Sequence, residues 1–149
     1  MRVAGYEWAE GARFQPGATK RSAPSAVGAH LEMLRRRLKG EITPADVLAD
    51  AKNPNSPLHP FFEWDEGAAA EQYRLQQARG LIRAVVAVYV SDDRPAVRQK
   101  AYIHVREPGA EHYRDTAQAL SQTRTREMVL RRAWEELQQW RKRYKDLEE

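Results

Sequence analysis

The apolar stripe near the C-terminal end constrains the fold more than any other feature of the sequence. Its members recur at intervals of three and four residues: Leu130, Ala133, Leu137, Trp140, Tyr144 and Leu147. This is the a/d pattern of nearly three heptads, so it predicts one amphipathic helix over residues 124–147, roughly 35 Å long. Such a helix exceeds what a single small domain usually covers.

Two alternatives follow for this helix, and the sequence leaves both open. It can pack across its own domain, or it can form a coiled coil with a second copy of the chain. Ala133 would leave a gap in an idealised dimer seam and Trp140 would be bulky there. The six stripe residues are nonetheless our candidates for self-association in a homodimer.

Composition limits the remaining choices. A chain of 149 residues suits one domain, or one domain with an appendage. Hydrophobic residues make up 42%, which is enough for a modest core, and the absence of cysteine excludes disulfides and thiolate metal sites. We find no leader-like segment at the start, and the longest apolar stretch, residues 84–90, is too short to span a bilayer. These features favour a cytoplasmic protein without membrane contact.

Local signals place several elements before the last helix. Residues 1–23 contain three glycines and a proline, which argue against regular structure, but also Tyr6, Trp8 and Phe14; they predict an irregular aromatic arm that lies on the domain. Helices are predicted over residues 24–39, from Pro44 after a Thr43 cap, and from an Asp65 cap to about residue 83.

The middle of the chain carries strand signals. Valine-rich residues 84–90 predict a strand, residues 97–105 its hairpin partner, and residues 112–115 a short third strand after a turn at Pro108-Gly109. The expected fold class is therefore α+β: three N-terminal helices, a hairpin or small antiparallel sheet, and the long C-terminal helix. The corresponding divisions are the arm at 1–23, an α+β domain at 24–122 and the last helix at 123–149.

Basic residues suggest a nucleic-acid interface. The formal net charge is +4, and cations cluster at the end of the first long helix and on the hairpin. Three helices followed by a hairpin is also the order of a winged helix, in which the third helix reads the major groove of double-stranded DNA and the hairpin touches its backbone. The candidate contacts are Arg35, Arg36, Arg37, Lys39, Arg74, Arg79, Arg94, Arg98 and Lys100.

Two features count against this hypothesis. The connection between the second and third helices, about twelve residues, is longer than the turn of most helix-turn-helix units. Acidic residues Glu63, Asp65, Glu66 and Glu71 lie near the start of the third helix, where a DNA reader needs a positive field. The competing hypothesis is an interaction or assembly module with no nucleic-acid role, in which the aromatic arm and residues 58–64 form a docking surface or an intramolecular clamp.

Signals for catalysis are sparse. His30, His59, His104 and His112 show no spacing of metal ligands, and no phosphate-binding loop, nucleophile elbow or paired-carboxylate motif is present. We therefore expect no enzymatic activity, no cofactor, no metal and no small-molecule substrate.

Several segments together resemble a family of small uncharacterised proteins of tailed bacteriophages and prophages. The similarity lies in residues 6–8 and 11–14, in 42–47, in 56–60 and 62–65, in 69–70 with 73–75 and 78–79, and in 140–144 with 146–148. It covers most of the chain. The resemblance implies expression in the cytoplasm of a bacterial host, where DNA-binding regulators, packaging accessories and small assembly proteins are the common roles.

Overall fold

The computed structural model describes residues 2–66, 70–107 and 110–147. The chain divides into two compact units, Met1–Asp115 and Thr116–Glu149, and each is considered by itself. Its elements are β1 (Arg2–Trp8), α1 (Ala18–Arg21), α2 (Pro24–Arg37), β2 (Glu41–Ile42), α3 (Pro44–Ala51), the 3-10 turn η1 (His59–Phe61), α4 (Glu71–Ala84), β3 (Val85–Ser91), β4 (Arg94–Lys100), β5 (Tyr102–Glu107), β6 (Ala110–Asp115), α5 (Thr116–Ser121), α6 (Thr123–Tyr144) and the 3-10 turn η2 (Lys145–Leu147). The predicted α+β class is confirmed.

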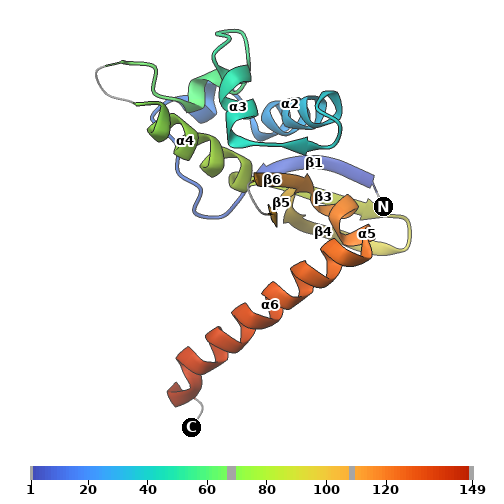
Figure 1. The fold of residues 1–149 in the computed structure, drawn as a ribbon. Helices are drawn as coiled ribbons and strands as arrows, with labels where there is room; N and C mark the ends of the chain where they lie inside the picture. Colours follow the sequence, from blue (N-terminus) through green and yellow to red (C-terminus); the bar gives the residue numbers. More distant parts are fainter. Residues whose placement is uncertain (1, 67–69, 108–109, 148–149) are drawn as a thin grey trace. The chain divides into compact units, whose positions relative to one another are not determined.

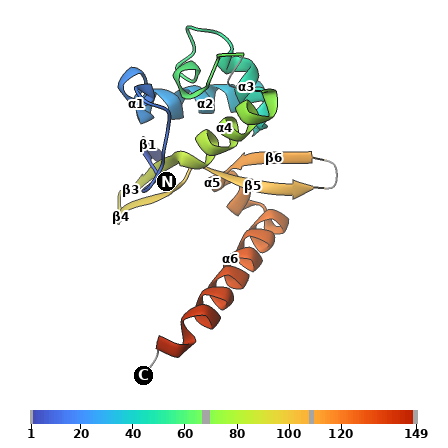
Figure 2. The same ribbon diagram turned by 90° about the vertical axis from the view of Figure 1, so that its left-hand side faces the viewer.

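Unit 1 contains two small antiparallel sheets, of strand order β1-β3-β4 and β2-β6-β5. Helices α2, α3 and α4 lie together on one side of the strands, and the β5–β6 hairpin extends below α4 in the turned view (Figures 1 and 2). The core between these layers is fully apolar at its centre, with Leu31, Ile42, Val47, Leu58, Phe62 and Val85 almost completely buried. Burial of a side chain of this size contributes about 1.5–3 kcal/mol.

Helix α3 begins where the sequence predicts. The Thr43 hydroxyl accepts a hydrogen bond from the Asp46 amide at 3.1 Å, and the Asp46 carboxylate accepts one from the Thr43 amide at 2.9 Å. This reciprocal pair satisfies two backbone donors that a helix start leaves unpaired. Helix α2 begins at Pro24 after Ala23, whose side chain makes no capping hydrogen bond.

The N-terminal arm is the clearest departure from the sequence prediction. Arg2–Trp8 is not irregular: it forms β1, an edge strand paired antiparallel with β3, with a register shift between Val3 and Gly5. The arm does lie on the domain, as predicted. Trp8, Phe14 and Phe61 pack with ring centroids 4.7–5.5 Å apart.

The predicted hairpin is also divided differently. β3 pairs with β4, but the chain then leaves this sheet at the buried Ala101 and continues as β5, which pairs with β6 in the other sheet. The predicted strand over residues 97–105 is therefore two strands in two sheets. The third strand is present as β6, and the predicted turn at Pro108-Gly109 lies outside the described residues.

Two helix predictions need adjustment. Helix α4 starts at Glu71 rather than at an Asp65 cap, and four α-helices, not three, precede β3 among the described residues, because Ala18–Arg21 forms the short α1. The long C-terminal helix is confirmed as α6, which the single turn η2 extends to Leu147. None of the described helices is both long and apolar enough to cross a membrane.

Candidate functional site

The nine candidate phosphate contacts lie on three separate elements of unit 1, and at least five of them are ion-paired. Arg35, Arg36, Arg37 and Lys39 are at or beyond the end of α2, Arg74 and Arg79 are on α4, and Arg94, Arg98 and Lys100 are on β4. Carboxylates lie within salt-bridge distance of Arg35, Arg36, Arg74, Arg79 and Arg98. Each pairing lowers the positive potential that a polyanion would meet.

The α2 cluster is organised around Glu32. Arg35 is buried and donates through Nε to a Glu32 carboxylate oxygen at 2.9 Å, whereas Arg36 is largely exposed and donates to the other oxygen at 3.2 Å. The Tyr102 hydroxyl donates to the same carboxylate at 3.4 Å. Burial alone would raise the pKa of Glu32, but the hydrogen bonds and charges of Arg35 and Arg36 outweigh it and hold the pKa below its usual value. Within the described residues, only Arg37 and Lys39 of this cluster are exposed and without a carboxylate in reach.

The predicted reader helix α4 has a structural arginine in place of a base contact. Arg74 is buried and donates through Nε to the Glu63 carbonyl at 2.9 Å and through Nη2 to the Glu66 carboxylate at 3.2 Å. Its guanidinium group also lies over the Trp64 ring, 5.4 Å from the ring centroid. Trp64 stacks on His59, and its Nε1 donates to the His59 carbonyl at 3.0 Å. These contacts hold Trp64 between His59 and Arg74 and tie this segment to α4.

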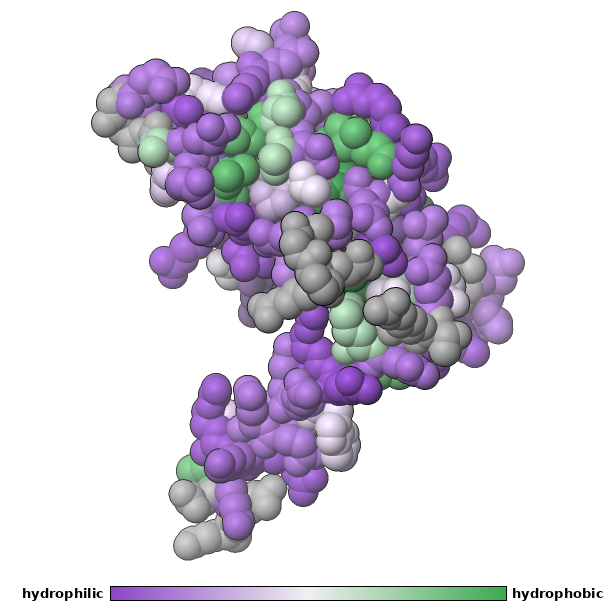
Figure 3. Space-filling view, viewed as in Figure 1, coloured by the Kyte–Doolittle hydropathy of each residue, from purple (hydrophilic) through white to green (hydrophobic). Residues whose placement is uncertain are grey.

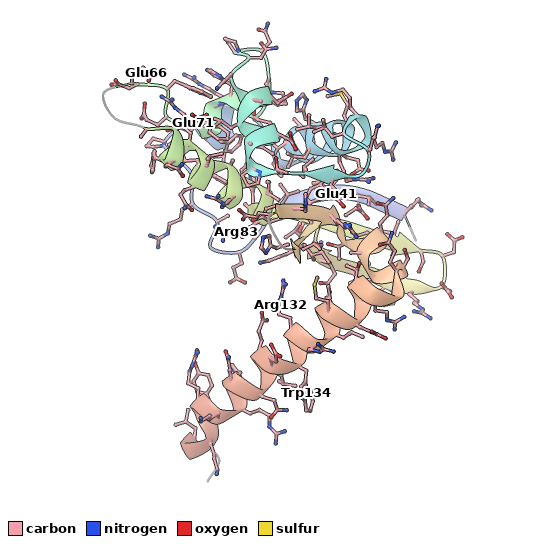
Figure 4. All side chains as sticks on the ribbon, viewed as in Figure 1. Glu41, Glu66, Glu71, Arg83, Arg132 and Trp134 are labelled. Atoms are coloured by element: carbon pink, nitrogen blue, oxygen red, sulfur yellow. The ribbon has the colours of Figure 1, made fainter. Side chains whose placement is uncertain are left out.

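The charges along α4 follow the helix dipole. Glu71 is in its first turn and Arg83 in its last, and Figure 4 shows Glu66 and Glu71 near the start of the helix and Arg83 near the end. Arg79 donates to Glu111 of β6 at 3.2 Å, which ties α4 to the β5–β6 hairpin. Between these charged ends, the exposed side chains of α4 are the uncharged Gln72, Tyr73 and Gln76.

Strand β4 is exposed along its whole length and forms an edge of its sheet. Arg98 donates to Glu7 of β1 at 2.7 Å and 3.2 Å across the sheet, and Arg94 is exposed. Charged residues and Pro95 on an edge strand also block pairing with other chains. Three carboxylates that pair with the candidate cations, Glu7, Glu32 and Glu111, were not identified from the sequence. Only Glu32 had a local signal: it precedes Arg35 and Arg36 by three and four residues, a spacing that indicates contact on a helix.

The histidines serve as links between elements. His30 Nε2 lies 2.7 Å from Asp50, joining α2 to α3, and His59 Nδ1 lies 2.7 Å from the Ala51 carbonyl. His112 lies 3.1 Å from Glu41 on the neighbouring strand. No group of three potential ligands that could hold a metal ion occurs in the part of the chain that the structure describes.

Unit 2 carries a different kind of surface, an exposed apolar face along α6. Large exposed side chains follow one another there: Leu130 at 54% exposure, Trp134 at 60%, Leu137 at 46%, Trp140 at 56%, Tyr144 at 39% and Leu147 at 77%. Trp140 and Tyr144 lie one turn apart with ring centroids 5.2 Å apart. Hydrophilic residues cover most of the α6 face visible in Figure 3, so the apolar residues are confined to part of its circumference.

Trp134 is the residue of this face that the sequence prediction missed. It follows Leu130 by four residues and precedes Leu137 by three, so the helical period places it beside the stripe. Figure 4 shows its side chain projecting from α6 on the side away from Arg132.

Comparison of the chain with models of known families gives no match, and neither characterised proteins nor solved structures show a significant similarity to it.

Proposed function

We propose that this protein is a protein–protein interaction or assembly module without catalytic activity, and that α6 provides its binding surface. The observation that carries the proposal is the exposed stripe of leucine and aromatic residues on α6, which includes two tryptophans more than half exposed. Contiguous apolar surface rimmed by charge marks interaction sites in soluble proteins, and tryptophan and tyrosine are enriched among residues that dominate binding energy.

A second argument comes from the helix itself. Most helical stability in proteins comes from packing of the apolar face rather than from propensity, and this holds for the 22 residues of α6 as well. Glycine and proline are absent from α6, so its sequence favours the helix locally. A segment with this propensity and an uncovered apolar stripe gains the rest of its stability when another polypeptide covers that stripe.

Hydrogen exchange of the α6 amides, measured by mass spectrometry over a range of protein concentrations, tests this function. We expect protection of residues 126–144 to be weak in dilute samples, with the α4 amides protected at every concentration as the internal control. Strong protection of α6 that is independent of concentration would mean that the stripe packs on its own chain, and would overturn the proposal.

Double-stranded DNA is the second candidate partner, and one observation favours it. Within unit 1, α2, β2, α3, α4, β5 and β6 follow the order helix, strand, helix, helix, strand, strand, and β2 pairs with β6 in the sheet β2-β6-β5. This order agrees with that of winged-helix domains when β3 and β4 are counted as an insertion, and it supports this second proposal. The wing would then be β5–β6 rather than the β3–β4 hairpin that carries Arg94 and Arg98.

The ion pairs described above weigh against this second function, because they occupy at least five of the nine candidate cations. A mobility shift on random duplex DNA, repeated over a salt series, tests it. A DNA-binding protein should lose affinity steeply as salt rises. Absence of binding at low salt would remove this candidate and would leave the interaction module unaffected. The relation to phage proteins implied by the resemblance stays a prediction.

A further inference from the structure

Resting on the proposed function of α6, we propose that the partner of its apolar stripe is a second copy of the same helix, docked antiparallel. The heptad positions define the geometry: Leu130, Leu137 and Tyr144 occupy a, and Ala133, Trp140 and Leu147 occupy d. In an antiparallel pair each a residue faces a d residue of the partner. The alignment that brings the whole stripe into contact places Leu137 opposite the partner's Trp140.

Side-chain volume supports this alignment over a parallel one. The antiparallel register sets Ala133 opposite the partner's Tyr144 and Leu137 opposite the partner's Trp140, so every bulky aromatic faces a smaller residue. A parallel register would instead stack Trp140 on Trp140 and leave a gap between two alanines. Facing large with small residues is how core layers interdigitate at native packing density.

Charge supports it as well. The antiparallel register brings Glu136 next to the partner's Arg143, once on each side of the two-fold axis, and Trp134 next to the partner's Arg141. The first contact is an ion pair and the second a cation–π contact, each of which contributes modestly at an exposed site. Glu136, Arg141 and Arg143 are all exposed on α6, as these contacts require. Opposed helix dipoles add to the preference for the antiparallel arrangement.

The available area is sufficient for a dimer. From their exposed fractions, Trp134 and the five large side chains of the stripe together present on the order of 700 Å² per chain, so two copies approach the roughly 1,600 Å² of a standard protein interface. The antiparallel pair also gives the exposed Trp134 a contact, because this residue lies at the e position and covers the edge of the interface. The antiparallel pair thus accounts for every large exposed apolar residue of α6.

Charge-exchange variants of the full chain test whether a second copy is the partner and whether the two α6 helices run antiparallel. The dimer dissociation constant of each variant is measured by sedimentation equilibrium. Glu136→Arg should weaken the dimer by about tenfold, since it replaces two symmetric attractions by two repulsions. Glu136→Arg combined with Arg143→Glu should restore the wild-type dissociation constant. Glu136→Arg combined with Arg141→Glu should not, because Arg141 is the partner of Glu136 only in a parallel pair. Glu135→Arg, the same change at the outward-facing f position, is the matched control and should leave the dissociation constant unchanged.

Rescue by Arg141→Glu rather than by Arg143→Glu would overturn the antiparallel arrangement. A wild-type chain that is monomeric at all accessible concentrations would overturn the second copy as the partner. The latter result leaves the proposed function standing when α6 is also unprotected in the hydrogen-exchange experiment, because the stripe is then open to a different protein. Concentration-independent protection removes both proposals together.

Discussion

The close contact between Gly28 of α2 and Tyr6 of β1 predicts both the sign and the size of the change in stability on Gly28→Ala. A Cβ atom on Gly28 would lie 2.1 Å from Tyr6 Cγ and 2.4 Å and 2.6 Å from the two Cδ atoms. Rotation about χ2 leaves Cγ in place, so the clash is relieved only by a change of χ1 or by a shift of the backbone. Gly80 of α4 is the matched control, because a Cβ there meets nothing within 4 Å.

Gly28→Ala gains about 1 kcal/mol of helix propensity but suffers overpacking that costs up to about 3 kcal/mol, a net loss of about 2 kcal/mol. Gly80→Ala keeps the propensity gain and should stabilise by about 0.5–1 kcal/mol. For a chain of this size we expect Tm to fall by about 8 °C for Gly28→Ala and to rise by about 3 °C for Gly80→Ala.

Urea unfolding followed by circular dichroism measures both variants on the full chain. A double-mutant cycle isolates the contact between Gly28 and Tyr6. In a Tyr6→Ala background, Gly28→Ala should no longer destabilise the protein, because the added methyl group then has space. If Gly28→Ala matches Gly80→Ala in wild-type background, β1 does not pack on α2 as described, and the assignment of residues 2–8 to the sheet is wrong.

Three further substitutions test other contacts of unit 1. Thr43→Ala should cost about 1 kcal/mol in urea unfolding by removing the α3 cap, while Thr43→Ser should be close to wild type; equal effects would argue against the capping box. Burial raises the pKa of Tyr89 to about 12, so between pH 10 and pH 12 the unfolded chain loses this proton before the folded one and stability falls as pH rises; Tyr89→Phe should show a smaller alkaline loss, and an unchanged pH profile would contradict it. The same variant should be at least as stable as wild type at pH 7, because the buried hydroxyl has no hydrogen-bond partner among the described residues. Arg74→Met should destabilise by about 2 kcal/mol and shift the Trp64 fluorescence to longer wavelength, since it removes the contacts that hold residues 63–66; an unchanged spectrum would show that the placement of Trp64 does not depend on Arg74.

The elements predicted correctly are those with local signals. Thr43-Pro44 and Asp46 specify the start of α3 within four residues, and the spacing of Val27, Leu31 and Leu34 identifies the buried face of α2. The length and period of α6 follow from the heptad pattern alone. In each case the information lies within a few turns of one helix, where sequence and structure are directly coupled.

The elements that were missed depend on distant partners. β1 contains glycine and has weak strand signals of its own, but it pairs with β3, which lies about eighty residues later in the chain. The division of residues 97–105 between two sheets depends on where β2 and β6 lie, not on the alternation of its side chains. Tertiary context overrides local propensity at both places.

The candidate site shows the same limit. A sequence displays where arginines occur but not which carboxylate faces them, so the ion pairs of Arg79 with Glu111 and of Arg98 with Glu7, over 32 and 91 residues, were not predictable. The apolar stripe of α6 was predictable because it is a property of one helix. What could not be read from the stripe alone is Trp134, whose importance depends on its exposure.

Cysteine cross-linking tests the central claim most directly, because the chain has no cysteine of its own and introduced thiols report without background. An equimolar mixture of the Ala133→Cys and Tyr144→Cys chains, under mild oxidation, should give a covalent heterodimer identifiable by mass, since the antiparallel pair places these positions face to face. A mixture that yields homodimers of either variant but no heterodimer would contradict the antiparallel pairing, and one that yields no covalent dimer would contradict pairing through α6.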